Sequence, residues 1–176
     1  MEDVGLRARR CALYDEYNAE LSHYGAVRGH PEETKTWAES FMELPWRWVD
    51  IYADDGRLAG FLILGFGLAC HPECDVYIAE TYLAPDHRGR GLMSAAVKDS
   101  LKKNFSRSVA LDVLPKNELA LAYWPELFRE MGWPPCEKTP YPHDEGETIA
   151  MYFERGSRLE KNGQLRERAL EAAMLY

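Results

Sequence analysis

The residues best suited to chemistry in this sequence form a short loop, His-Arg-Gly-Arg-Gly at positions 87–91. An apolar helical run follows it, and no Ser, Thr, Asp or Asn stands at the helix start, so the first amides lack a side-chain cap. The two glycines let the backbone approach a ligand closely. Uncapped amides, the helix dipole and two arginines together favour a phosphate or pyrophosphate. The alternative is a tight turn whose arginines are only solvated.

Charge is distributed unevenly along the chain. The 176 residues include 21 Lys and Arg against 29 Asp and Glu, a formal net charge of −8. Between Pro85 and Arg107, however, six basic residues outnumber two acidic ones. The overall acidity argues against a nucleic-acid partner, whereas the local basic segment suits a discrete anionic ligand.

Several other classes are excluded by motif and composition. A P-loop is absent, and the Rossmann pattern would need a third glycine where Ser94 stands. Cys-His-Pro-Glu-Cys at 70–74 raises the question of zinc, but no second pair of ligands follows, so we expect a polar hairpin loop and no metal. The longest apolar window, 58–70, is too short for a bilayer, and the charged N-terminus resembles no secretory signal. We therefore expect a cytoplasmic protein without a membrane partner.

An α/β (α+β) set of elements must position the loop, with helices packed against a mixed sheet. Apolar periodicity and turn residues predict these elements. The expected helices are about 7–24, a short one after Pro31, 91–104, 117–131 and an amphipathic extension at 157–176. The expected strands are the two arms of a hairpin around the turn 53–57, then 75–83, 108–114, about 136–139 and 148–154. We therefore expect one domain at 1–156 and a C-terminal helix at 157–176.

Two linked segments resemble the GCN5-related N-acetyltransferases. Their signature is a strand, a proline and Arg/Gln-x-x-Gly-x-Gly/Ala opening a helix, and this chain has ETYLAPDHRGRGLM at 80–93. LDVLPKNELALAYWPELFREMGW at 111–133 is similar to the family's strand, Asn, Ala, helix and terminal Gly-aromatic pair. The resemblance covers about 46–154 and implies a mixed, mostly antiparallel sheet flanked by helices, here with an extra C-terminal helix.

The resemblance implies acetyl-CoA as the co-substrate and no metal. Backbone amides of the loop and of the first helical turn would cradle the pyrophosphate, and a strand splayed by a bulge would pair with the pantetheine arm. The amide of Leu83 would polarise the thioester carbonyl. The implied cofactor-binding residues are Thr81, Tyr82, Leu83, Arg88, Gly89, Arg90, Gly91, Leu92, Met93, Ser94 and Asn117.

The implied catalytic residues are Glu80 and Tyr123. Glu80 lies on the strand leading into the loop and is our candidate base for the acceptor amine; the alternative is a carboxylate that orients a neighbour or pairs with Arg88. The family's general-acid tyrosine corresponds here to Phe128, which cannot donate a proton. Tyr123 could replace it, or it could be a core aromatic. Met93 also departs from the signature, and it either displaces the pyrophosphate or turns into the core.

The predicted function is transfer of an acetyl group from acetyl-CoA to a primary amine, on a small cationic molecule. Carboxylates and aromatic side chains in the first two helices and near the last strands favour a cationic acceptor. The segment 137–147, with two prolines, suggests a loop that gates this substrate. The alternative is a non-catalytic acyl-CoA sensor or an interaction module of the same fold. The C-terminal helix suits either a homodimer interface or a cap on the sheet.

Overall fold

The computed structural model describes residues 4–26, 38, 42, 46–66, 74–104, 106–134, 137–143 and 146–155. Its helices are α1 (Val4–His23), the short 3-10 helix η2 (Pro85–His87), α3 (Leu92–Lys103) and α4 (Glu118–Glu130). Its strands are β1 (Arg47–Tyr52), β2 (Leu58–Phe66), β3 (Val76–Leu83), β4 (Ser108–Val113), β5 (Glu137–His143) and β6 (Gly146–Glu154). The helices expected after Pro31 and at 157–176, and most of the loop at 70–74, lie outside the described residues.

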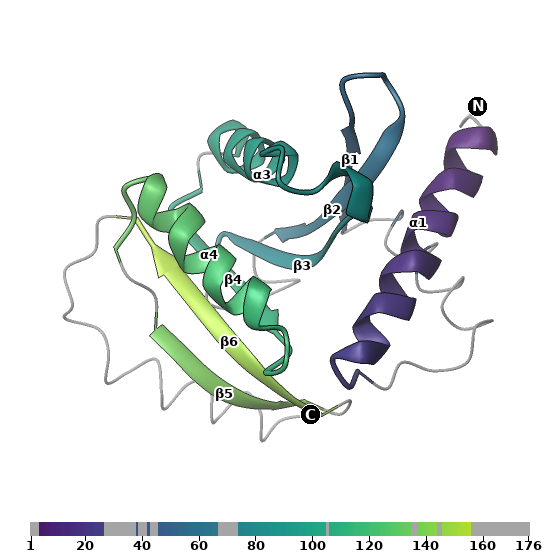
Figure 1. Cartoon of the computed structure of the whole chain (residues 1–176). Coiled ribbons are helices and arrows are strands. Elements are labelled where there is room, and N and C mark those ends of the chain that lie inside the picture. Colours follow the sequence, from purple (N-terminus) through teal and green to yellow (C-terminus); the bar gives the residue numbers. More distant parts are fainter. Residues whose placement is uncertain are drawn as a thin grey trace.

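The described strands form one six-stranded sheet in the order β1-β2-β3-β4-β6-β5 (Figure 1). All neighbouring pairs are antiparallel except β3 and β4, which run parallel. The mixed, mostly antiparallel sheet flanked by helices is therefore confirmed. The hairpin expected around 53–57 is also confirmed, since the Ala53 amide donates to the Arg57 carbonyl at 2.9 Å and closes the turn between β1 and β2.

Hydrophobic clusters lie on both faces of the sheet, because its central strands are buried on both sides. The larger cluster joins the sheet to α3 and α4 and includes Val97, Leu101, Trp124, Leu127 and Phe128. The smaller cluster joins Leu13 and Tyr14 of α1 to Phe61 and Ile63 of β2. Figure 1 shows α1 standing apart from α3 and α4 accordingly.

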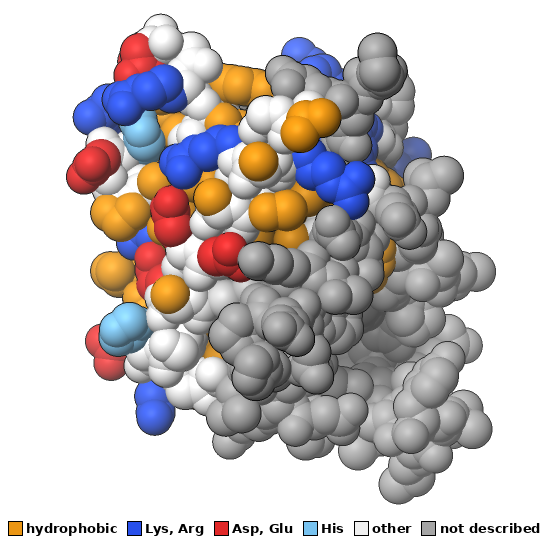
Figure 2. Space-filling model, turned by 90° about the vertical axis from the view of Figure 1, so that its right-hand side faces the viewer, with side chains coloured by type: hydrophobic (Ala, Val, Ile, Leu, Met, Phe, Trp, Pro, Cys, Tyr) orange, Lys and Arg blue, Asp and Glu red, His pale blue; other side chains and the backbone are white. Residues whose placement is uncertain are grey.

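Helix α1 is also attached to the sheet by a largely buried ion pair. The Arg10 guanidinium donates from Nε and Nη2 to the two carboxylate oxygens of Asp50 on β1, each at 2.9 Å. Trp48 Nε1 donates to the same carboxylate at 3.0 Å, and Arg10 lies 5.9 Å from the centre of the Trp48 ring. On the α1 side of the molecule acidic, basic and apolar side chains are interspersed (Figure 2).

A proline inside α4 is accommodated by a side chain from β5. Pro125 has no amide hydrogen to donate to the carbonyl of Leu121 one turn earlier. Lys138 Nζ donates to that carbonyl instead, at 3.1 Å. The helix therefore continues to Glu130 through the proline.

The prediction of a substrate-gating loop at 137–147 is wrong for most of that segment. Residues 137–143 form β5, which pairs with β6 from Glu137 opposite Tyr152 to His143 opposite Gly146. Pro140 and Pro142 are tolerated because β5 is the last strand of the sheet, and an edge strand needs ladder donors on one side only.

Candidate functional site

The parallel strands β3 and β4 separate partway along their length. Their pairing runs from Val76 opposite Val109 to Ile78 opposite Leu111 and goes no further among the described residues. Strand β3 nevertheless continues to Leu83, still paired with β2 on its other edge. The β4 side of Thr81–Leu83 therefore offers backbone groups to which an extended chain can hydrogen-bond.

The place where β3 separates from β4 after Ile78 is called the fork. A β-bulge in β3 decides which way its side chains point beyond the fork. Ile63 of β2 pairs with Glu80 whereas Leu64 pairs with Ile78, so Ala79 is an extra residue. Val76 and Ile78 belong to the cluster under α3 and α4. A single extra residue reverses the alternation of a strand, so Glu80 faces α1.

The start of α3 provides uncapped backbone amides. Gly91 is the N-cap, with φ of 77° and no side-chain cap, and the first intrahelical bond runs from the Ala95 amide to the Gly91 carbonyl at 2.9 Å. The space beside Gly89 and Gly91 is open, because a Cβ added at either would meet nothing within 4 Å. Amides, helix dipole and open space fit the pyrophosphate of an acyl-CoA. Met93, which departs from the family signature, packs against the larger hydrophobic cluster, so its side chain turns into the core.

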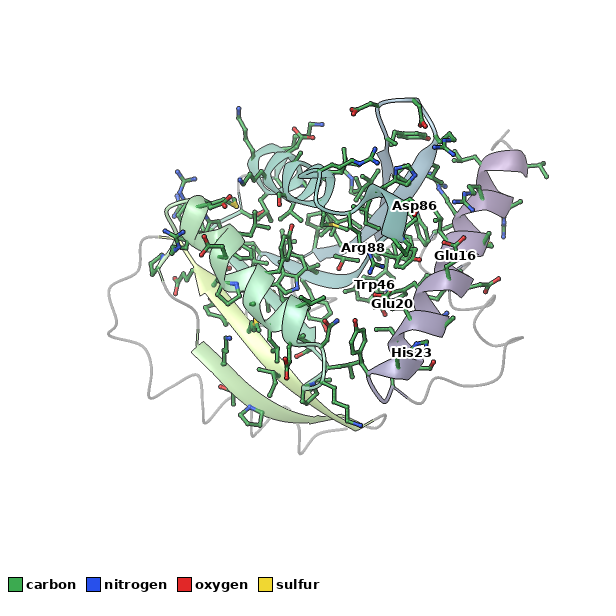
Figure 3. The ribbon with its side chains drawn as sticks, in the orientation of Figure 1. Glu16, Glu20, His23, Trp46, Asp86 and Arg88 are labelled. Carbon is green, nitrogen blue, oxygen red and sulfur yellow. The ribbon has the colours of Figure 1, made fainter. Side chains whose placement is uncertain are left out.

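The Arg88 side chain points from the loop toward α1 (Figure 3). Its Nη2 donates to Glu20 at 2.5 Å and its Nε to the Leu83 carbonyl at 2.7 Å. Its guanidinium lies 5.6 Å from the centre of the Tyr82 ring, and its amide donates to the Pro85 carbonyl at 3.1 Å. Arg88 therefore ties the loop to α1 and to the end of β3; a contact with the cofactor stays a prediction.

Glu80 is buried, with 7% of its surface exposed, and accepts a hydrogen bond from the hydroxyl of Tyr17 on α1. Glu16, the residue before Tyr17 on α1, accepts a hydrogen bond of 3.3 Å from the hydroxyl of Tyr82. Burial, followed by the negative charges of Glu16 and Glu20, raises the pKa of Tyr82 to about 12. Three side chains within little more than one turn of α1, those of Glu16, Tyr17 and Glu20, thus connect the helix to β3 and the loop.

The face of the fork that meets α1 also holds two residues that sequence reasoning missed. Tyr77 donates to Asp112 of β4 at 2.7 Å, and its ring lies 6.5 Å from that of Trp46. Burial, together with the charge of Asp112, raises the pKa of Tyr77 well above its ordinary value. Alternation in the segment 108–114 could have identified Asp112, since the apolar residues on either side of it face the opposite cluster.

The remaining predicted residues lie on or beside α4. Tyr123 lies 3.0 Å from Ser94 of α3, hydroxyl to hydroxyl, and burial raises the pKa of Tyr123. Phe128 is fully buried and stacks on Phe153 at 3.8 Å, so it is a core residue. Asn117 caps α4, accepting a bond of 3.1 Å from the Ala120 amide. The structure brings Tyr123 to the start of α3, on the other face of the sheet from the Glu80 contact with α1.

Within the described part of the chain, no group of three or more His, Cys, Asp and Glu side chains could hold a metal ion. None of its helices combines the length and apolarity needed to span a membrane.

Comparison with known structures identifies the same architecture in acetyltransferases. The spermidine N-acetyltransferase of Vibrio cholerae, solved in complex with CoA and spermine, is 16% identical, with a TM-score of 0.59 over 87% of this chain and 92% of its own. The yncA protein of Salmonella typhimurium with its cofactor acetyl-CoA is 16% identical, with a TM-score of 0.55 over 86% and 91%. A histone acetyltransferase HPA2 and related acetyltransferase from Corynebacterium glutamicum is 13% identical, with a TM-score of 0.60 over 89% and 95%. These likenesses establish the fold.

Sequence comparison places the chain in one family. Comparison with curated proteins found no match. The model of the acetyltransferase (GNAT) family, however, matches residues 11–128, which include α1 from Cys11 onward, the fork between β3 and β4, the loop and most of α4. The protein belongs to the GNAT acetyltransferase family.

Proposed function

We propose that this protein transfers the acetyl group of acetyl-CoA to a primary amine of a small cationic molecule. The observation that carries the proposal is the fork beside an uncapped helix. Strand β3 leaves β4 after Ile78, and a short distance along the chain α3 begins after its N-cap Gly91, with no side-chain cap. An extended pantetheine and a pyrophosphate require those two features in that order.

In this proposal the donor is held mainly by the backbone. The amides of Leu92, Met93 and Ser94 would bind the pyrophosphate, and the backbone of Thr81–Leu83 would bind the pantetheine arm. The Leu83 amide would donate to the thioester carbonyl oxygen, where negative charge develops during attack. Asn117 is assigned to the thiol end of the cofactor by the family resemblance, beside its role as a helix cap.

The acceptor reacts on the α1 face of the fork. A lysine-like amine has a pKa near ~10.4, so it arrives protonated and must lose a proton before attack. Glu80 takes that proton, directly or through water. The nitrogen lone pair then forms a bond to the acetyl carbon, the carbon–sulfur bond breaks, and sulfur leaves with its electron pair. The second amine proton passes to the thiolate, so the products are an amide and CoA thiol.

The class of acceptor is supported by the chemistry around Glu80. Glu16 and Glu20 on α1 provide negative charge, which Arg88 offsets at Glu20 (Figure 3). Tyr17 and Tyr82, whose ring centres lie 5.9 Å apart, provide aromatic walls for a cationic amine. The spermidine N-acetyltransferase of Vibrio cholerae, solved in complex with spermine, supports the same class. A cytoplasmic location and a homodimer stay predictions.

The first test is calorimetric titration with acetyl-CoA. We expect micromolar binding that is lost in Gly91→Glu, which places a negative charge and a strained side chain at the proposed pyrophosphate. Gly132→Glu is the matched control, because Gly132 also has positive φ and open surroundings but lies beyond the end of α4. Equal loss in both variants, or no binding by the wild type, would refute the donor site.

The second test measures CoA thiol release with a panel of amines that begins with spermine. We expect release that depends on the amine and falls about 10²–10⁴-fold in Glu80→Gln. A second candidate function, an acyl-CoA sensor, is favoured by one observation: Phe128, which stands in the position of the family's acid, is buried in the core. Tight binding without turnover across the panel would support the sensor.

A further inference from the structure

We propose that Tyr17 is a positioning residue for Glu80, so that helix α1 completes the catalytic centre. This inference rests on the proposed function, in which Glu80 accepts the proton of the acceptor amine. The motif of the family lies in β3, the loop and α3. The structure adds a hydroxyl from an element more than 60 residues earlier in the chain, since the contact joins residues 17 and 80.

The contact depends on the bulge in β3. If β3 alternated regularly through Ala79, without the bulge, Glu80 would share the face of Ile78, inside the apolar cluster under α3 and α4. The bulge instead turns the carboxylate toward α1, where Tyr17 donates to Oε2. A buried carboxylate in an apolar environment is costly unless it is hydrogen-bonded, so this donor is part of what allows Glu80 to be buried there.

The position of the Tyr17 hydroxyl is fixed by ring packing rather than by the hydrogen bond alone. Its ring meets Phe61 edge-on at 5.7 Å and 88°, and meets Tyr14 at 5.7 Å and 66°. It also lies 5.9 Å from Tyr82. Edge-to-face geometry at these distances is the favoured arrangement of aromatic pairs. The hydroxyl is therefore held in place before any substrate arrives.

The neighbouring residues of α1 hold the helix against the same segment. Glu16 accepts from Tyr82, two residues beyond Glu80, and Glu20 accepts from Arg88 in the loop. The three links are spaced along one side of the helix. Tyr17 thus fixes the rotamer of the Glu80 carboxylate at the fork, where a displacement of about 1 Å can cost about 100-fold in rate. In the reaction Glu80 gains the amine proton and Tyr17 keeps its own.

The test compares Tyr17→Phe with wild type, using spermine and a lysine-like amine as acceptors. The substitution keeps the ring and removes only the hydroxyl. We expect an unchanged Kd for acetyl-CoA and a kcat lower by about 10–100-fold. The matched control is Tyr14→Phe, the same change one turn earlier on α1 in a fully buried ring. It should leave kcat within about twofold of wild type.

Two readouts separate positioning from a purely structural role. First, the losses in Tyr17→Phe and Glu80→Gln should not multiply in the double variant, because both act through one carboxylate. Second, the loss in Tyr17→Phe should shrink for an α-amine of pKa about 7.7–8.0, which needs less help to deprotonate than a lysine-like amine.

The possible failures are distinguishable. If Glu80→Gln is slow but Tyr17→Phe is not, or the two losses multiply, or Tyr14→Phe is equally slow, the positioning role is refuted while the proposed function stands. If the wild type turns over no amine, the proposed function itself fails and this inference fails with it. If Glu80→Gln is as fast as wild type, the role of Glu80 as base fails, and this inference with it, while acetyl transfer stands.

Discussion

A substitution at Gly60 of β2 offers a direct way to disturb the fork from the β2 side of β3. It pairs with Leu83, the last residue of β3, and a Cβ added at Gly60 would lie 2.2 Å from the Tyr82 carbonyl oxygen and 2.9 Å from the Leu83 Cα. Both atoms belong to the backbone, so no side-chain rotation can relieve the clash. The substitution Gly60→Ala must therefore push β2 and the end of β3 apart by about 1 Å to reach an ordinary contact.

The expected cost follows from that displacement. Overpacking of a filled interior costs about 1–3 kcal/mol. The loss of chain entropy in the unfolded state offsets about 0.4–1 kcal/mol when Gly becomes Ala. We therefore expect Gly60→Ala to lower the free energy of unfolding by about 1–2 kcal/mol, which corresponds to a Tm lower by about 2–8 °C for a chain of this size.

The assay pairs thermal unfolding with calorimetric titration of acetyl-CoA. Because the displaced segment is the proposed pantetheine site, the Kd for acetyl-CoA should rise about tenfold, beyond any effect of stability. Gly56→Ala is the control: it strains a turn glycine with φ of 78°, but its Cβ meets nothing within 4 Å. It should lower Tm and leave the Kd unchanged. A wild-type Tm and Kd in Gly60→Ala would refute the reasoning.

Three further predictions concern stability. Tyr82 keeps its proton in the folded state up to about pH 12, whereas an unfolded tyrosine loses it near pH 10. The free energy of unfolding should therefore fall as the pH rises from about 10 to 12, and it should fall less steeply in Tyr82→Phe. Equal pH slopes for the two proteins, measured by urea unfolding, would contradict this. Asp50→Asn removes the carboxylate that pairs with Arg10 in a largely buried site, so it should lower the free energy of unfolding in urea by about 2–4 kcal/mol. A loss under about 0.5 kcal/mol would show that the pair behaves like an exposed one. Lys138→Met should lower the free energy of unfolding by about 1 kcal/mol in the wild-type background. It should have no effect in Pro125→Ala, where the amide of residue 125 can donate to the Leu121 carbonyl. Equal losses in the two backgrounds would show that Lys138 does not replace the missing donor.

The comparison of sequence and structure is most informative along β3. Alternation and β-propensity predicted a strand at 75–83, and the structure has β3 at Val76–Leu83. The family resemblance implied a bulge in this strand, and the structure has one, but its position at Ala79 could not be predicted, because a strand's pattern does not reveal which residue lacks a partner. That single residue decides that Glu80 faces α1 and not the larger cluster.

The expected roles of aromatic residues on α4 show the same limit. The family motif identified the position of Phe128, and the absence of a hydroxyl there is evident from the sequence. Whether Tyr123 lies in the core or near the cofactor loop depends on how α4 packs against the rest of the protein. The structure places Tyr123 beside Ser94 and leaves Phe128 against Phe153.

The sequence by itself determined most of the described elements, the uncapped helix after the Arg-Gly-Arg-Gly loop and the family, because these depend on local composition, periodicity and motif spacing. Tertiary structure alone decided which distant residues share the fork: Tyr17 with Glu80, Tyr77 with Asp112, and Arg88 with Glu20. Such pairs depend on the register of strands and the docking of α1, and both are set by interactions between segments far apart in the chain. The physical reason is that local sequence fixes the direction of the backbone, whereas only packing fixes where two side chains meet.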